Sequence, residues 1–316
     1  MRLFVDAWQP GYGTSLDVED EPGDRSSAAL DTDLELPADE WRPLAPPPGV
    51  TAPEVVHVVD GVRRIDARVW LESDDQTYPG IAASYAAGVV RCDRRGGVAE
   101  LVTAQIERGI FTPAPDVAAV GVPPSRYEAH QVAVRGPNDL VNAVQSGLRA
   151  VEERVSNAVA RDGELLVVDG PLRGRVHLAN ALGYVKTHST QYLPDRLTAI
   201  VTGLHSGQRT PLFTIGGKWP LHTWYLRLPG PEGHAWAGIV RVECTGNLAT
   251  DAAIALADVS VVTLPRFAST AYKDPRAPQN LVPIAGLEKR LRALLGDPRL
   301  LHRGLVRCAA TAGASR

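Results

Sequence analysis

The pattern of apolar and polar positions predicts a β-rich beginning followed by mixed strands and helices. Residues 55–59 and 81–90 form apolar runs, and residues 62–71 alternate between apolar and polar side chains. Runs and alternations of this length are typical of strands, and the short connections between them, including Asp60-Gly61, predict antiparallel neighbours. A separate strand is predicted over residues 3–8.

Helical periodicity is clearest over residues 138–160. The apolar positions recur every three or four residues, as on one face of an α-helix, and they are Leu140, Val144, Leu148, Val151, Val155 and Val159. Further helices are predicted over residues 98–108, 192–204, 249–262 and 281–295. Further strands are predicted over residues 164–169, 182–186, 210–215, 221–228 and 235–243.

This order of elements predicts an α/β fold. Three antiparallel strands followed by a helix and a parallel strand is how a ribonuclease H-like core begins, with a mixed sheet flanked by helices. We expect residues 54–316 to form this domain. We expect residues 1–53 to be an N-terminal extension, because residues 14–40 are strongly acidic and residues 43–53 are rich in proline. Such an arm either contacts a basic surface of a partner or serves as a solvated linker.

Composition fits a globular protein, and the charge is divided unevenly along the chain. The chain has 316 residues, of which 44% are hydrophobic, so a sizeable core can form. No apolar stretch approaches the roughly 20 residues of a membrane span, and the N-terminus lacks the apolar run of a signal peptide, so we expect a cytoplasmic protein. The net charge of −3 argues against a nucleic-acid partner. Residues 14–40 alone carry −9, however, which leaves the remaining chain at +6.

The sequence lacks the motifs of several enzyme classes. The three cysteines, Cys92, Cys244 and Cys308, are far apart and show no zinc-finger spacing. The chain contains no Walker A motif, no GxGxxG after a strand, no HExxH and no GxSxG. ATP hydrolysis, nicotinamide chemistry, zinc-dependent proteolysis and lipase-like catalysis are therefore unsupported.

Two Asp-Gly steps each follow an apolar strand, at Asp60-Gly61 and Asp169-Gly170. Asp-Gly is also an ordinary turn signal, so either step alone fits a plain turn. If the two strands are neighbours, their C-terminal ends gather at one site and bring the carboxylates face to face. Close carboxylates repel unless a cation lies between them, and Mg²⁺ or Mn²⁺ suits a site made only of oxygen atoms.

A third carboxylate is available on the long helix. Glu152 lies at the border of the apolar stripe and is aimed toward the sheet, whereas Glu153 lies on the solvent side. Glu152 also fits an ordinary charge beside a buried face. After the strand over residues 182–186, His188 and Tyr192 are positioned to contact DNA, although structural roles fit them equally well.

The residues that carry these features resemble the NurA family of nucleases. The resemblance lies in the runs VVHVVDGVRR, LRAVEERV, LLVVDGPL and LGYVKTH, and it covers roughly residues 55–295. The segment from Glu152 to Lys186, with the family's order and spacing, is its most specific part.

The resemblance implies a fold, an activity and partners. NurA proteins have a ribonuclease H-like fold, cleave DNA with a divalent metal, form dimers and work with the hexameric DNA translocase HerA in end resection. By position, Asp60, Glu152 and Asp169 correspond to metal ligands. Lys186 corresponds to the lysine near the scissile phosphate or the bound strand.

The sequence departs from the family at one position. NurA proteins usually supply a histidine from their last helix, and Gly286 stands about where it would be expected. Asp274 or Glu288 could substitute, because carboxylates also bind Mg²⁺ or Mn²⁺. The primary hypothesis is a metal-dependent deoxyribonuclease that works with a HerA-type translocase in DNA repair or in defence against foreign DNA. The alternative is an inactive adaptor that binds HerA and DNA without cleaving.

Overall fold

A computed structural model describes residues 29–316, apart from residues 74, 162, 189, 218–219, 231–232 and 315–316. The strands are β1 Leu30–Asp31, β2 Val55–Ser73, β3 Gln76–Asp93, β4 Val98–Thr112, β5 Val120–Val122, β6 Ser125–Gln131, β7 Leu165–Asp169, β8 Ala181–Val185, β9 Phe213–Ile215, β10 Leu221–Arg227 and β11 Ile239–Thr245. The helices are α1 Asp139–Val159, α2 Asp195–Thr202, α3 Thr250–Thr263, α4 Val282–Leu294 and α5 Pro298–Ala314, with 3₁₀ turns η1 Arg173–Arg175 and η2 Leu264–Phe267. The strand predicted over residues 3–8 lies outside the described residues.

The chain divides into two compact units. Among the described residues, the first unit contains residues 29–59, 90–100 and 159–285, and the second contains residues 60–89, 101–158 and 286–316. The chain passes between the units inside continuous elements, including β2 after Val59 and α4 after Ala285.

In the first unit the strand order is β1-β9-β10-β11-β8-β7-β2. The beginning of β2 runs parallel to β7, and β7 runs parallel to β8. The remaining neighbours, from β8 through β11 and β10 to β9 and β1, pair antiparallel. The sheet is therefore mixed, with its parallel part where β2, β7 and β8 meet.

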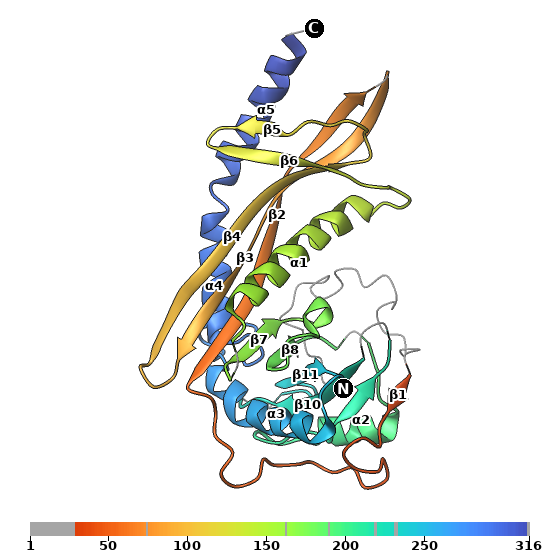
Figure 1. Ribbon diagram of the computed structural model, residues 1–316, viewed down its shortest axis with the longest axis vertical. Helices are drawn as coiled ribbons and strands as arrows, with labels where there is room; N and C mark the ends of the chain where they lie inside the picture. The colour runs from red at the N-terminus through yellow and green to blue at the C-terminus, as the bar shows by residue number, and fades with distance from the viewer. Residues whose placement is uncertain are drawn as a thin grey trace. The chain divides into compact units, whose positions relative to one another are not determined.

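In the second unit the strand order is β2-β3-β4-β6-β5. Successive long strands β2, β3 and β4 run in opposite directions (Figure 1), and β6 joins β4 in parallel. Helix α1 and the α4–α5 pair lie on opposite faces of these strands: Gly61 faces α1, whereas Arg64 binds the backbone after α4.

The topology is the predicted ribonuclease H-like one. Strands β2, β3 and β4 are consecutive neighbours, α1 follows them, and β7 and β8 then run parallel to β2. The α/β fold class, with a large mixed sheet flanked by helices, is confirmed. No helix within the described residues is long and apolar enough to cross a membrane.

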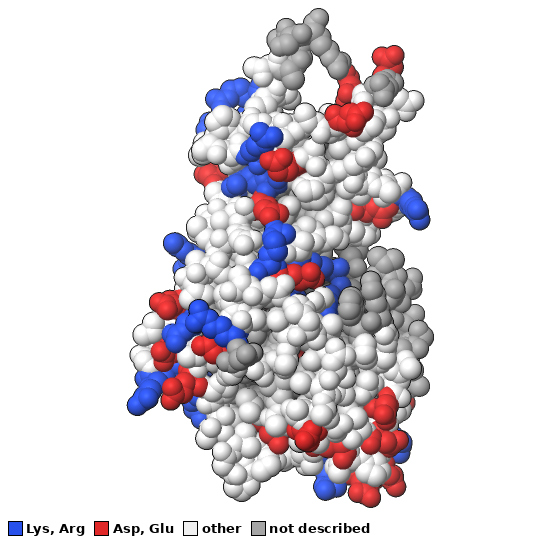
Figure 2. Space-filling model, in the orientation of Figure 1, with Lys and Arg blue, Asp and Glu red and all other residues white. Residues whose placement is uncertain are grey.

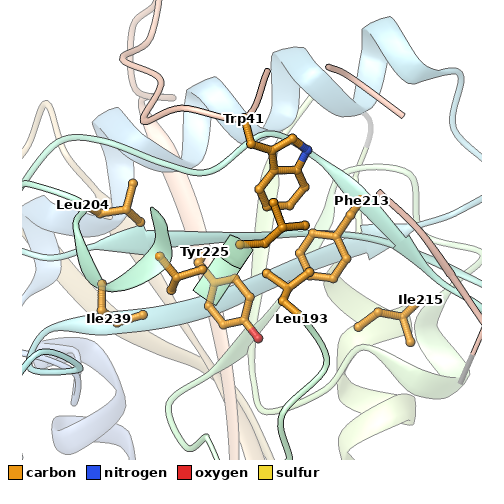
Figure 3. Close-up of a cluster of buried hydrophobic side chains, with 9 residues drawn as sticks. Trp41, Leu193, Leu204, Phe213, Ile215, Tyr225 and Ile239 are labelled. Atoms are coloured by element: carbon orange, nitrogen blue, oxygen red, sulfur yellow. The ribbon is translucent and has the colours of Figure 1, made fainter. Parts of the chain in front are cut away.

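The described part of the N-terminal extension contributes to the core of the first unit. Trp41 is buried in a cluster with Phe213 and Tyr225, and its ring centroid lies 5.9 Å from that of Phe213 (Figure 3). Glu35 binds the buried Arg209 through both carboxylate oxygens, at 2.8 and 2.9 Å. The domain boundary at residue 53 stays a prediction, but residues 29–53 include core side chains.

Two sequence-based assignments are wrong. Residues 98–108 form part of strand β4 instead of a helix, because the turn at Gly96-Gly97, with φ of +64° at Gly97, folds the chain back from β3. Asp60-Gly61 is not a turn, because β2 continues through it to Ser73. The sequence reading also missed β5, β6 and the last helix, α5.

The other predicted elements are present with shifted ends. Helix α1 lies within one residue of its predicted bounds, and Val144, Leu148, Val151 and Val155 on its apolar stripe are buried. Helix α2 is shorter than predicted, since the chain before Asp195 is not helical.

Candidate active site

The register between β2 and β7 fixes the backbone positions of the two predicted aspartates. Val59 is the Cα partner of Val168 in this parallel pair. Asp60 follows Val59 directly along β2, and Asp169 follows Val168 directly along β7. The printed pairing ends at Val59 and Val168; Asp169 belongs to the first unit, and Asp60 begins the second.

Asp169 belongs to a buried polar network in the first unit. Lys186 Nζ donates to Asp169 Oδ2 at 2.6 Å and to Asn280 Oδ1 at 3.2 Å. Asn280 Nδ2 in turn donates to Asp274 Oδ2 at 2.6 Å, and Arg276 also binds Asp274. Burial would raise the pKa of Asp274, but the hydrogen bonds from Asn280 and Arg276 outweigh it and hold the pKa below its usual value.

The loop after Asp169 is also fixed by hydrogen bonds. Gly170 has a φ of +98°, which favours glycine, so this Asp-Gly step is a true turn. Glu243 Oε1 accepts the backbone N–H of Leu172 at 2.7 Å, and Glu243 Oε2 accepts a hydrogen bond from Arg241 at 2.7 Å. Burial alone would lower the pKa of Arg241, but the charge of Glu243 raises it. The loop that follows the candidate ligand is therefore held by a buried ion pair.

In the second unit, Asp60 lies beside a carboxylate from α4. Asp60 is only 7% exposed, and one of its carboxylate oxygens lies within 4.8 Å of one from Glu288. Even-numbered residues of β2 point to the face that carries α4 and α5, as Arg64 does, which explains why Asp60 meets Glu288. Glu288 lies on the same helix face as the buried Ile284 and Leu291.

Glu152 lies over the backbone of β2. A Cβ atom added at Gly61 would overlap the Glu152 carboxylate and lie 2.7 Å from Leu148 Cδ1. Gly61 therefore allows α1 to approach β2 closely, a common reason for glycine inside a strand. Among the described residues, Glu152 does not join Asp60 and Glu288 in a group whose ligand atoms are all within 4.8 Å of one another.

The position of the expected histidine faces away from this carboxylate pair. Gly286 is exposed, and a Cβ added there would have open space around it. Residues 286 and 288 are about 200° apart around an α-helix, so they point in different directions. Of the two suggested substitutes, Asp274 is engaged by Asn280 and Arg276, whereas Glu288 is next to Asp60.

Of the predicted DNA-contacting residues, Lys186 is buried in the first unit, and His188 and Tyr192 are partly buried there. Lys186 is 5% exposed. His188 Nε2 is 3.0 Å from the carbonyl of Ile239, and its ring packs on Trp236. Tyr192 lies under the Arg241 guanidinium, whose carbon is 4.9 Å from the ring centroid. All three residues thus have contacts within the protein, and their contact with DNA stays a prediction.

The donor chemistry fits a divalent cation. Asp60 and Glu288 are carboxylates close enough to repel each other, and neither is strongly exposed. Mg²⁺ and Mn²⁺ prefer such oxygen ligands, and a cation removes the repulsion. The cysteine thiols do not offer an alternative centre, since burial raises the pKa of Cys92 to about 11 and that of Cys244 to about 12.

Charge on the visible surface is mixed. Lysine and arginine side chains are interspersed with aspartate and glutamate on the face drawn in Figure 2, and no broad basic patch occurs among the described residues of that face. The net charge outside the acidic arm is thus not gathered into one basic field on this face.

Two solved structures resemble the fold. The NurA nuclease from Sulfolobus solfataricus is 12% identical, with a TM-score of 0.48, over 79% of this chain and 81% of that one. The Endonuclease_V protein from Bacillus subtilis is 13% identical, with a TM-score of 0.34, over 79% and 85%. No family model and no curated protein matches the sequence. Both TM-scores are below 0.5, so the residues of the chain itself must support any functional assignment.

Proposed function

We propose that the protein is a divalent-metal-dependent deoxyribonuclease whose metal ligands are Asp60, Asp169 and Glu288. The observation that carries this proposal is the pairing of the buried Asp60 with Glu288 in the second unit. Asp169 joins the proposed ligands because the NurA resemblance implies it and because it directly follows the buried strand β7. A Mg²⁺ or Mn²⁺ ion bound there would supply Lewis-acid chemistry and lower the pKa of a bound water, as phosphodiester hydrolysis requires.

Other residues of the chain position the proposed ligands and balance their charge. The Glu243–Leu172 hydrogen bond fixes the loop behind Asp169, so the direction of that carboxylate is set before any ligand binds. Glu152 lies against β2 one residue after Asp60, where it supports the same site from the α1 face. In the metal-free protein, Lys186 donates a 2.6 Å hydrogen bond to Asp169 and balances its charge.

The partners remain part of the proposal. DNA is the substrate, and the HerA-type hexameric translocase and the homodimer are those that the NurA resemblance implies. The exposed Gly286 keeps the adaptor hypothesis open, because a lost ligand would leave binding without cleavage. A cleavage assay separates the two functions.

The experiment incubates the purified chain with labelled single-stranded and double-stranded DNA, with Mn²⁺ or Mg²⁺, and with or without a HerA-type ATPase. We expect metal-dependent cleavage that chelation by EDTA abolishes. Asp60→Asn, Asp169→Asn and Glu288→Gln should each lower the rate by more than about 100-fold, since loss of a residue that only hydrogen-bonds a metal ligand already costs about 10–100-fold.

Two neighbouring glutamates provide a matched control. Glu152→Gln should reduce cleavage, whereas Glu153→Gln, the same change one position along α1, should leave it unchanged. DNA binding without cleavage under every condition would replace the nuclease with the adaptor. Full activity of Glu288→Gln would remove Glu288 from the ligand set.

A further inference from the structure

A buried polar cluster in the first unit is the chain of contacts that runs from Asp169 through Lys186 and Asn280 to Asp274. Each of its hydrogen bonds is between 2.6 and 3.2 Å. Asn280 is fully buried, and Lys186 and Asp274 are 5% and 7% exposed. A buried ammonium group needs acceptors on the protein, because water is not there to solvate it.

Asp169 and Asn280, which both accept hydrogen bonds from Lys186, differ in kind. Asp169 is charged and is a proposed metal ligand, whereas Asn280 is neutral and belongs to a segment that the Tyr184 hydroxyl also holds, by a 2.6 Å hydrogen bond to the Gln279 carbonyl. The amide orientation is fixed by its neighbours: the oxygen of Asn280 accepts from Lys186, and its nitrogen donates to Asp274. An aspartate in place of Asn280 could not make the second hydrogen bond.

From this arrangement we infer that Lys186 is an internal cation that occupies Asp169 in the metal-free protein, and that Asn280 is a positioning residue that retains the ammonium group when a metal ion takes the carboxylate. This inference rests on the proposed function. Lys186 and the metal ion then compete for Asp169, while Asn280 lowers the cost of displacing Lys186, because the ammonium group keeps one acceptor.

The inference predicts opposite signs for two substitutions. Lys186→Met removes the competing charge at similar length and should tighten Mn²⁺ binding about tenfold, the effect expected of one charge within about 4–6 Å. Asn280→Leu removes the Asn280 acceptor from a displaced Lys186 and should weaken Mn²⁺ binding severalfold. In the double variant the effect of Asn280→Leu should vanish, since no ammonium group remains to be retained.

The experiment titrates Mn²⁺ into each full-length variant and follows free Mn²⁺ by electron paramagnetic resonance, without DNA. Far-ultraviolet circular dichroism establishes that each variant is folded. Asp258→Asn is the matched control, because it breaks a different buried ion pair of the first unit, Arg209–Asp258, and should leave Mn²⁺ affinity unchanged. If Lys186→Met does not fold, Asn280→Leu and Lys186→Arg, which retains the charge and should bind Mn²⁺ like the wild type, carry the test.

The outcomes separate this inference from the proposed function. Absence of Mn²⁺ binding by the wild-type chain would overturn both. Wild-type binding that Asp169→Asn abolishes, together with unchanged or weaker binding in Lys186→Met, would overturn the inference alone. Unchanged binding in Asn280→Leu would remove the role of Asn280.

Discussion

The two Asp-Gly steps have the same sequence, but glycine is needed in each for a different structural reason. At Asp169-Gly170 the strand ends, and the glycine adopts a φ of +98° that forms a turn. At Asp60-Gly61 the strand continues, and the glycine makes room for Leu148 and the Glu152 carboxylate. One glycine is needed for its backbone and the other for its missing side chain, so an Asp-Gly step marks a candidate site without defining its shape.

The aspartates differ in the same way. Asp169 is neutralised by the buried Lys186, whereas Asp60 has the carboxylate of Glu288 nearby. Lys186 balances the charge of Asp169, whereas within its own unit Asp60 lies beside the like charge of Glu288. Substitutions at both steps can test whether this contrast is real.

The largest expected effect on stability comes from Asp169→Asn. It leaves the buried Lys186 without its counter-charge, and breaking a buried pair typically costs about 3–5 kcal/mol. Asp60→Asn should cost less, because it removes one of two neighbouring negative charges. Urea denaturation of the metal-free variants measures the difference. Asp93→Asn, at a solvent-accessible ion pair with Arg91, is the control and should cost much less stability than Asp169→Asn.

Equal losses for Asp60→Asn and Asp169→Asn would contradict the electrostatic contrast. A loss at Asp169 that disappears in the Lys186→Met background would support it directly, since the pair would then be absent in both proteins.

The second effect concerns Gly170. Its φ of +98° strains any residue with a Cβ, although open space surrounds the position. Gly170→Ala should therefore destabilise the protein by about 1–3 kcal/mol through backbone strain. Thermal denaturation measures it. Gly97→Asn, at another positive φ, is the comparison, because asparagine tolerates that conformation.

A third, smaller effect on stability is expected at Gly61. An added methyl group would displace the ends of two flexible side chains, Leu148 and Glu152. Gly61→Ala should therefore cost about 1 kcal/mol, at the lower end of the range for overpacking and less than Gly170→Ala. Its effect on DNA cleavage should exceed its effect on stability, because it moves the Glu152 carboxylate. Activity that falls only in proportion to the folded fraction would contradict a role for Glu152.

Sequence patterns predicted the features of the fold that depend on a single helix or strand. The apolar stripe of α1 and the runs of β7 and β8 are visible in the sequence, because burial of one face or of a whole strand selects apolar residues. The order of these elements was enough for the fold class. The chemistry at Asp60 and Asp169 could be proposed for the same reason, since each follows a buried apolar run.

Contacts between distant elements could not be predicted. The proximity of Glu288 to Asp60 depends on how α4 packs on β2, and the sequence pattern favoured neither Glu288 nor Asp274. The core position of Trp41 was hidden by the acidic and proline-rich residues around it. Residues 98–108 have apolar spacing that suits a helix as well as a strand, and only pairing with β3 decides.

The smallest effect is expected at Gly286, the third glycine in the comparison. It lies inside α4 without a positive φ, is exposed, and has open space where a Cβ would be. Neither backbone nor packing requires glycine there, so Gly286→Ala should stabilise the protein by about 0.5–1 kcal/mol through helix propensity. Gly286→His should leave Mn²⁺ affinity unchanged, because position 286 points away from Glu288. Tighter Mn²⁺ binding in Gly286→His would return the metal site to the family's histidine position and remove Glu288 from it.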